Sequence, residues 1–271
     1  MLNKKIAQPF ILLLVVLFSL MMTQPKKERS LKKDAINQNL FSASLVINTA
    51  PQEAPALPFN FEGQSALARE LNGGIVFYEL NSAKRWPIAS LTKLMTATVA
   101  LEKIGKSNRV DDLIKIMVLI SDNDSADELA NNYGREKFIE AMNQKTQELG
   151  MDQTSFFDPS GLSFLNQSTA NDLYKLVGYI SVYHPEILQW SREKELIADG
   201  KKYVNINKFV GRSDFLGGKT GYTDEANGNL VSVFSSPEKP IIVVVLGTAN
   251  KIERFEQTKN LLEWIFQYYK L

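Results

Sequence analysis

The sequence predicts an α+β domain in which an antiparallel sheet packs against helices that form a helical subdomain. Stretches with strand character lie near both ends of the folded part, at 65–80 and 204–246, and a block with helical apolar periodicity separates them. An asparagine and two glycines at 72–74 are a strong turn signal, which indicates that the first two strands form a hairpin. Strands at both ends with helices between them indicate an antiparallel sheet in an α+β domain.

Each element has its own signal in the chain. Pro87 disfavours helix at Trp86, so the first helix can begin only near Ala89 or Ser90. Thr169 opens a later helix with a capping box. The further helices are expected at 110–120, 124–133, 135–149, 169–183 and 252–270. The strands are expected at 65–71, 75–80, 204–210, 216–223, 230–234 and 241–246.

Composition excludes several classes of function. The chain has 271 residues, 44% hydrophobic and 23% charged, which suits one sizeable domain with a full core plus appendages. A net charge of +1 gives no reason to expect a nucleic acid partner. The absence of cysteine excludes disulfides and thiol catalysis, and a single histidine, His184, argues against a zinc site. The position of His184 at a helix end before a proline is typical of a surface or capping role.

The first residues have the character of a membrane segment. Lys4 and Lys5 precede an apolar run at 9–22, and no cleavage signal follows it directly. Five basic residues follow the run and two precede it, a bias that opposes export of the remainder. A short strand is expected near 40–47. The predicted organisation is a signal anchor or signal peptide at 1–23, a linker at 24–62 and a folded domain at 63–271.

A candidate catalytic pair lies at the start of the first helix. Ser90 and Lys93 are three residues apart, so on a helix they share one face and the amine can reach the hydroxyl. A lysine placed in this way can activate a serine without histidine. Free N–H groups and the dipole at the helix N-terminus favour developing negative charge. The same spacing occurs four times in the chain, against about one match expected by chance.

The spacing alone is therefore weak evidence, and the prediction of a catalytic site depends on two further motifs. Ser121-Asp122-Asn123 is the only Ser-x-Asn sequence in the chain. Lys219-Thr220-Gly221 is the only Lys-Thr-Gly sequence. Both follow Ser90 in the order that penicillin-recognising serine enzymes use.

With these motifs and their surroundings, residues 64–270 resemble the D-alanyl-D-alanine carboxypeptidases, the low-molecular-mass penicillin-binding proteins. The resemblance implies a β-lactamase/transpeptidase-like fold. Blocks of this length are far more specific than three-letter motifs. The blocks that carry the resemblance are 87–97, 121–126, 158–162 and 218–226.

The resemblance implies a role for each residue of the first two motifs. Ser90 would be the nucleophile that forms an acyl-enzyme with the penultimate D-Ala carbonyl, and Lys93 would be the general base. Ser121 would relay a proton to the leaving amine, with Lys93 and Lys219 orienting it. Asn123 would hold the peptide group of the substrate. No cofactor or metal is implied.

The third motif would bind the end of the substrate. Lys219 and Thr220 would bind its terminal carboxylate on a strand edge, and Gly221 would let the backbone approach it closely. The N–H groups of Ser90 and Tyr222 would form the oxyanion hole. The implied partners are peptidoglycan stem peptides as substrates and β-lactam antibiotics as acylating inhibitors. The N-terminal segment would attach the domain to the membrane, outside the cytoplasm.

Two features depart from the family pattern. Only 31 residues separate Ser90 from Ser121, fewer than is usual in the family, so we expect a cleft that is more open on that side. The chain stops after the predicted closing helix, whereas many relatives continue into a β-domain and a membrane-binding tail. An N-terminal anchor could replace that tail.

Three other activities stay open at this point. Peptidoglycan D,D-endopeptidases share the same motifs with carboxypeptidases. A class A β-lactamase would need a glutamate that activates water, in a Glu-x-x-x-Asn sequence. The only such match between Asn123 and Lys219 is Glu128 with Asn132, and it lies directly after the second motif, too early in the chain. A non-catalytic wall-binding homologue could retain the fold, although intact Ser90, Lys93 and Lys219 argue against it.

Overall fold

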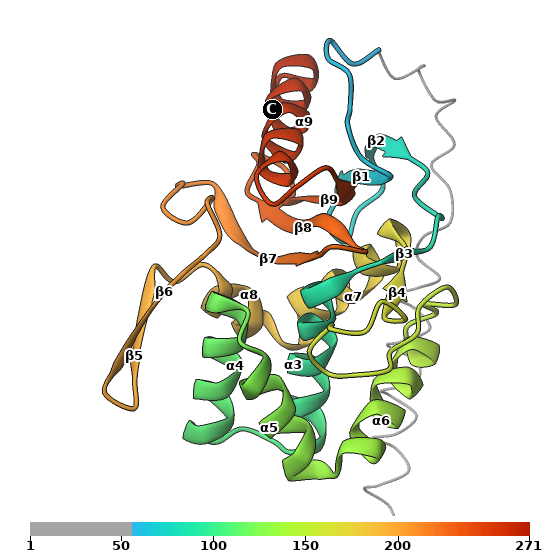
Figure 1. Ribbon diagram of the computed structural model, residues 1–271. Coiled ribbons are helices and arrows are strands. Elements are labelled where there is room, and N and C mark those ends of the chain that lie inside the picture. Colours follow the sequence, from blue (N-terminus) through green and yellow to red (C-terminus); the bar gives the residue numbers. More distant parts are fainter. Residues whose placement is uncertain (1–55) are drawn as a thin grey trace, which may run out of the picture. The chain divides into compact units, whose positions relative to one another are not determined.

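The structure is a computed structural model that describes residues 56–271. Within this part, a helical block lies between two N-terminal strands and three C-terminal strands, as the sequence predicts (Figure 1). No helix of the described part has the length and apolar character that crossing a membrane requires. The predicted membrane segment at 1–23 and the short strand near 40–47 lie outside the described residues.

A five-stranded antiparallel sheet forms the centre of the domain, in the order β2-β1-β9-β8-β7. The strands are β1 (Ser65–Glu70), β2 (Val76–Leu80), β7 (Phe215–Thr223), β8 (Asn227–Phe234) and β9 (Ile241–Thr248). β1 pairs with both β2 and β9, so the first and last strands of the domain meet in one sheet. The central strand β9 is buried at every position, which explains its unbroken apolar run.

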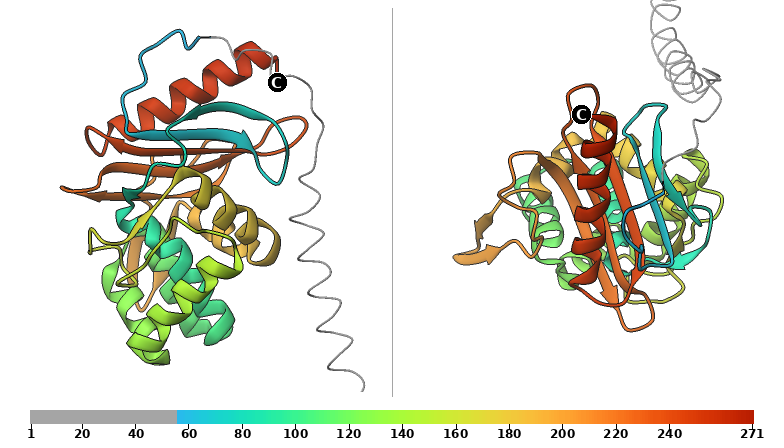
Figure 2. Two further views of the ribbon diagram at one scale, coloured as in Figure 1. Left: turned by 90° about the vertical axis from the view of Figure 1, so that its right-hand side faces the viewer. Right: turned by 90° about the horizontal axis from the view of Figure 1, so that it is seen from above.

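Helices cover both faces of the sheet. Helix α9 (Glu253–Tyr269) lies across one face, and the helical block packs against the other (Figure 2). Apolar side chains of α9 such as Phe255 and Leu261 pack with Leu230 and Val243 of the sheet. The two apolar layers exclude water from both faces, and β7 is left as the edge strand beside the helical block.

Helix α3 is the centre of the helical block. Ten of its twelve residues are buried, so helices surround it on nearly every side. Ser107 and Thr169 cap α4 and α7 by accepting hydrogen bonds from the backbone. The elements are η1 (Ala89–Leu91), α3 (Thr92–Lys103), α4 (Asn108–Ile120), α5 (Asn123–Tyr133), α6 (Arg135–Glu148), α7 (Ala170–Tyr183) and α8 (Pro185–Ser191).

The predicted strand at 204–210 is wrong. A hairpin of β5 (Glu195–Ala198) and β6 (Lys201–Val204) ends where that strand was expected to begin. Asn205 donates to the carbonyls of Ser191 and Glu193, and Asn207 accepts from a nearby backbone N–H. Such local side-chain bonds replace a strand ladder. Helix α8, the β5–β6 hairpin and the short pair β3 (Trp86–Pro87) and β4 (Gln167–Ser168) were not predicted as elements.

A buried ionic cluster joins α3, α6 and α7. Glu102 accepts from Tyr179 Oη at 2.6 Å and from Lys145 Nζ at 2.7 Å, and His184 Nε2 lies 3.3 Å away. Burial acts to raise the pKa of Glu102, but hydrogen bonds from His184, Lys145 and Tyr179 outweigh it and lower the pKa to about 2. The charged form of Glu102 therefore stabilises the folded state. His184 belongs to this cluster, and it ends α7 as a capping position.

We expect Glu102→Gln to lower the free energy of unfolding by about 3 kcal/mol at pH 7, because a pKa difference of about 2.5 units is then lost. A lowered carboxyl pKa stabilises the fold above its unfolded value, near 4.5, and this contribution disappears as the pH falls toward 2. The difference between wild type and variant should therefore shrink between pH 5 and pH 3 in urea titrations.

Glu148→Gln is the matched control. Glu148 also pairs with Lys145, at 2.5 Å, but its side chain is 58% exposed. Its loss should cost under about 1 kcal/mol. A Glu102→Gln difference that is the same at pH 7 and at pH 3 would contradict the assigned pKa.

Candidate active site

The start of α3 brings Ser90 and Lys93 together, as the spacing predicts. Ser90 lies in η1 and is partly exposed, whereas Lys93 is fully buried beneath it. The amine of Lys93 lies 3.0 Å from Ser90 Oγ. Since the amine has no contact with water, its N–H groups need polar partners within the protein.

The Lys93 amine has two other partners. It donates to Asn123 Oδ1 at 2.8 Å and to the backbone carbonyl of Ser160. Both oxygens can only accept, whereas the hydroxyl of Ser90 can also donate. A neutral amine has two N–H groups and one lone pair. The two carbonyl oxygens occupy the N–H groups, and the lone pair is left for the proton of Ser90.

Burial lowers the pKa of Lys93 to about 8, while the carboxylates of Asp158, Asp122 and Asp127 act in the opposite direction. At pH 7 about a tenth of the molecules therefore hold Lys93 as a neutral amine, far more than for a lysine in water. The environment makes Lys93 suited to accept a proton near neutral pH.

Ser121 reaches the site from the end of α4. Its backbone is left-handed, with φ 65°, and its hydroxyl accepts a hydrogen bond from Lys219 Nζ at 2.9 Å. We expected both lysines to orient Ser121. In the structure Lys219 makes that contact, whereas Lys93 forms hydrogen bonds with Ser90, Asn123 and Ser160. Ser121 and Asn123 thus each connect to a different lysine.

Lys219 lies on β7 in a strongly positive environment. Its amine is buried and also donates to the Thr220 carbonyl at 2.9 Å. Burial and the charges of Lys93 and Arg254 lower the pKa of Lys219 well below its ordinary value. Arg254, from α9, donates to the Gly221 carbonyl at 2.8 Å, and burial lowers its pKa to about 10. Among the described residues, neither Lys219 nor Arg254 pairs with a carboxylate.

Gly221 is needed where β7 passes the nucleophile. A Cβ at this position would lie 2.6 Å from the carbonyl oxygen of Ile88 and 3.3 Å from the nitrogen of Ser90. We expected Gly221 to allow a close approach of the substrate to the backbone. In the structure, Gly221 allows a close approach between two segments of the protein. It brings the strand that carries Tyr222 against the segment that carries Ser90.

A turn at 158–163 completes the site, and its role was not predicted. It presents the Ser160 carbonyl to Lys93, and Gly161 packs so closely that a Cβ would lie 2.0 Å from the carbonyl oxygen of Ala89. The block 158–162 was part of the family resemblance, but no residue in it suggested a function. Arg254 was also missed, because a single arginine in an amphipathic helix gives no sequence signal.

Glu128 does not serve the site. Both of its carboxylate oxygens pair with Arg109, at 2.9 and 2.7 Å, and its side chain is 40% exposed. A glutamate held there in a bidentate ion pair is not a base for water next to Ser90. The β-lactamase alternative therefore loses the only sequence match that lies between the second and third motifs.

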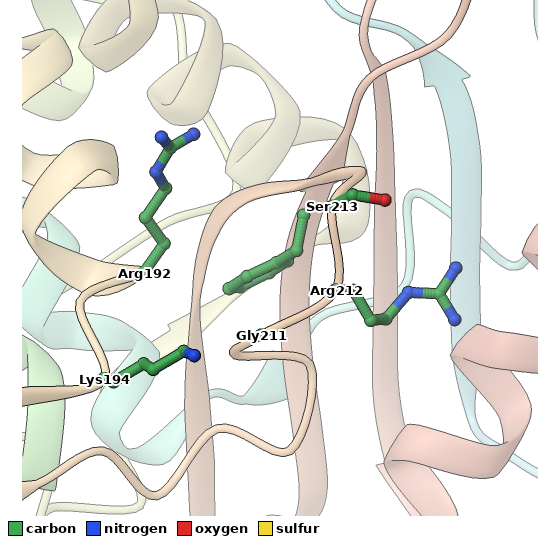
Figure 3. A pocket seen from close by; sticks show the side chains of 6 residues that line it. Arg192, Lys194, Gly211, Arg212 and Ser213 are labelled. Carbon is green, nitrogen blue, oxygen red and sulfur yellow. The ribbon is translucent and has the colours of Figure 1, made fainter.

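A separate pocket of about 260 Å³ lies between residues 192–194 and 211–215 (Figure 3). Arg192 and Lys194 lie on one side of it, whereas the side chains of Arg212 and Ser213 point away from them. Arg212 is bound by Asp214 at 2.7 Å. The cations do not converge on a common point, and none of the predicted site residues lines this pocket.

Taken together, the fold and the site are those of a serine-type enzyme with a lysine beside the candidate serine. A partly exposed serine lies at the start of a buried helix with a lysine beneath it, and a second serine is bonded to a second lysine. This arrangement is typical of acyl-transferring enzymes in which a lysine takes the place of the catalytic histidine.

The chain belongs to the D-alanyl-D-alanine carboxypeptidase family, since residues 49–109 and 100–250 match it. The D-alanyl-D-alanine endopeptidase of Pseudomonas aeruginosa is 31% identical, over 83% of this chain and 84% of that protein. The D-alanyl-D-alanine carboxypeptidase DacF of Bacillus subtilis is 27% identical, over 77% of this chain and 63% of that protein.

A solved structure has the same fold. Penicillin-binding protein D2 from Listeria monocytogenes, in its cefotaxime-bound form, superposes with a TM-score of 0.71 at 28% identity. The match covers 77% of this chain and 98% of that protein. The family resemblance and the predicted fold class are confirmed.

Proposed function

We propose that the protein is a serine-type D-alanyl-D-alanine carboxypeptidase that acts on peptidoglycan stem peptides through an acyl-enzyme on Ser90. The assignment of the substrate rests on one observation. Lys219 and Arg254 are buried cations without a carboxylate partner among residues 56–271. An unpaired buried cation is costly and suits a site that receives an anion. A peptide that ends in D-Ala-D-Ala supplies a terminal carboxylate there.

The proposed reaction begins at Ser90. Its hydroxyl proton passes to the lone pair of Lys93 as Oγ attacks the penultimate carbonyl carbon, and the N–H groups of Ser90 and Tyr222 stabilise the oxyanion. Ser121, oriented by Lys219, then relays the proton that Lys93 accepted to the nitrogen of the departing D-Ala. Water hydrolyses the ester and regenerates Ser90.

We expect benzylpenicillin to form a covalent adduct on Ser90, detectable by mass spectrometry of the intact protein and of its peptides. Ser90→Ala should abolish the adduct and leave the thermal unfolding transition nearly unchanged, because Ser90 is partly exposed. The rate of acylation should rise with pH through about 8 as Lys93 loses its proton.

Ser236→Ala is the matched control, since Ser236 begins another Ser-x-x-Lys sequence and its hydroxyl donates to the Lys239 carbonyl. It should be labelled like the wild type. An adduct on another residue, or none on the folded wild type, would refute the proposed nucleophile.

A second candidate is a D,D-endopeptidase that cleaves cross-links. Relatives from Pseudomonas aeruginosa, Escherichia coli and Haemophilus influenzae named D-alanyl-D-alanine endopeptidase are 31–33% identical, and the chain covers 73–84% of their length. For three relatives named carboxypeptidase the chain covers only 46–63%. These similarities support the endopeptidase, whereas the buried cations support a carboxylate-terminated substrate.

Lys219→Gln separates the two candidates. If Lys219 pairs with a terminal carboxylate, the variant should lose about 10- to 200-fold in kcat/KM on a peptide ending in D-Ala-D-Ala, as charge-assisted bonds are worth about 1.5–3 kcal/mol. The loss should be much smaller on the same peptide with an amidated end. D-Ala release and amide cleavage would be measured by liquid chromatography.

Cleavage of a cross-linked stem-peptide dimer is measured in parallel. Equal losses on the free and amidated peptides would assign Lys219 to proton transfer through Ser121. Faster turnover of the dimer than of the D-Ala-D-Ala peptide would make the endopeptidase the better assignment.

We also propose that the domain acts outside the cytoplasm, held at the membrane by residues 1–23. The support is the apolar run in the sequence and the location of peptidoglycan. Protease added to spheroplasts should digest the domain, with a cytoplasmic enzyme left intact as the control. Protection until the membrane is lysed would overturn this location.

A further inference from the structure

The turn at 158–163 is organised around one carboxylate. Asp158 Oδ1 accepts from the backbone N–H groups of Ser160 at 2.8 Å, Gly161 at 2.6 Å and Leu162 at 3.3 Å, and from Ser160 Oγ at 2.9 Å. Oδ2 accepts from the N–H of Ser163 at 2.7 Å. Burial acts to raise the pKa of Asp158, but these bonds lower it, so the group is ionised at neutral pH.

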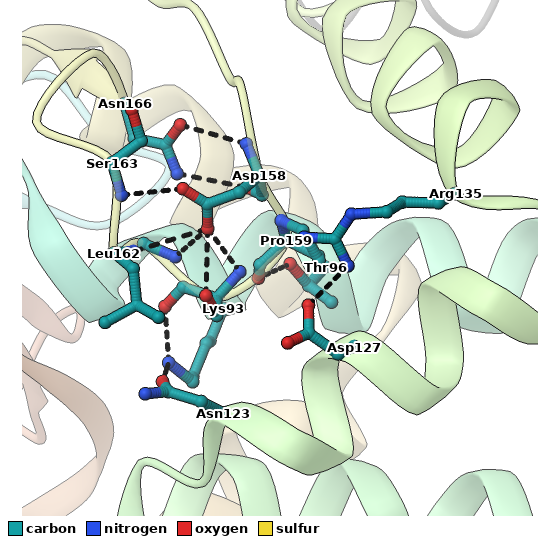
Figure 4. Close-up of polar contacts among 12 residues, drawn as sticks. Lys93, Thr96, Asn123, Asp127, Arg135, Asp158, Pro159, Leu162, Ser163 and Asn166 are labelled. Carbon is teal, nitrogen blue, oxygen red and sulfur yellow. Dashed lines mark hydrogen bonds and ion pairs between the residues drawn. The ribbon is translucent and has the colours of Figure 1, made fainter.

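This turn is docked on the helix that carries the base. Thr96 Oγ1 donates to the Pro159 carbonyl at 2.5 Å, one helical turn after Lys93. The Lys93 amine donates to the Ser160 carbonyl, and Figure 4 shows the Asp158 carboxylate enclosed by its own turn close to Lys93. Asn166 fastens the other side of the turn by donating to the Asp158 carbonyl at 3.0 Å.

The carboxylate faces Lys93 from the turn, and other charged groups face it from the neighbouring elements. Asp122 and Asp127 lie at the start and in the middle of α5, but Asp127 is paired with Arg135 at 2.6 Å and Asp122 caps the helix. Lys219 lies on the side of β7. Asp158 is the strongest of the three carboxylate influences on Lys93.

We propose that Asp158 is a positioning residue for Lys93: its hydrogen bonds fix the turn that presents the Ser160 carbonyl, and its negative charge sets the pH range in which Lys93 acts as a base. The inference rests on the proposed role of Lys93. A base must hold the proton that it accepts, and burial alone would weaken that ability. The charge of Asp158 offsets part of the effect of burial, and the turn keeps the lone pair aimed at Ser90.

The test is the pH dependence of acylation by a fluorescent penicillin, measured as a second-order rate constant on the full chain. Asp158→Asn keeps an accepting oxygen for the turn and removes the charge. The acid limb of the profile, near pH 8 in the wild type, should then move to lower pH by roughly one unit. The plateau rate should fall, because the amide cannot accept the bond from Ser163.

Thr96→Val is the matched control, since it loosens the same turn without changing any charge. It should lower the plateau rate and leave the acid limb in place. Asp158→Ser, which offers a hydroxyl to the turn, should move the limb in the same direction as Asp158→Asn.

An unchanged acid limb in folded Asp158→Asn would overturn the electrostatic role. If neither Asp158 variant folds, the carboxylate is required for the turn itself and the separate role in tuning Lys93 is also overturned. Absence of acylation in the wild type would instead refute the proposed function, so the two failures are distinguishable.

Discussion

A lysine amine without contact to water sits beneath the nucleophile, and three separate segments must meet to supply its partners. Ser90 comes from the start of the same helix, Asn123 from the start of α5, and the Ser160 carbonyl from a turn far along the chain. Loss of either carbonyl acceptor, from Asn123 or Ser160, would leave an N–H group of the buried amine without a partner and would destabilise the fold. The packing of the helical block around α3 therefore also brings the partners of Lys93 together. Stability and chemistry depend on the same contacts.

Positive charge is the second constraint. Lys93, Lys219 and Arg254 are all buried, and burial lowers the pKa of each. Three carboxylates, those of Asp158, Asp122 and Asp127, act on Lys93, whereas the other two cations bind a hydroxyl and backbone carbonyls. Carboxylates thus offset part of the positive charge around Lys93. Among the described residues, the cations on the β7 side have no carboxylate partner. An anion bound there would favour the charged form of Lys219, so binding and protonation are linked.

The sequence predicts those parts of the site that depend on local geometry. Helical spacing places Lys93 under Ser90, and turn-prone residues end α4 at Ser121. Contacts between distant segments have no such signal. Arg254 reaches Gly221 across 33 positions, and the Ser160 carbonyl reaches Lys93 across 67. The same limit applies to the fold, because local bonds from Asn205 override the strand propensity of its neighbours.

The segment around Ser90 shows how backbone conformation supports the site. Ala89 has φ 47°, a left-handed value that costs free energy for a residue with a side chain. Two other backbones hold it in place: the turn closes on it at Gly161, and β7 closes on the same segment at Gly221. A Cβ at either glycine would push one of these backbones away. The two glycines thus allow the turn that contacts Lys93 and the strand that carries Lys219 to converge on one strained residue next to Ser90.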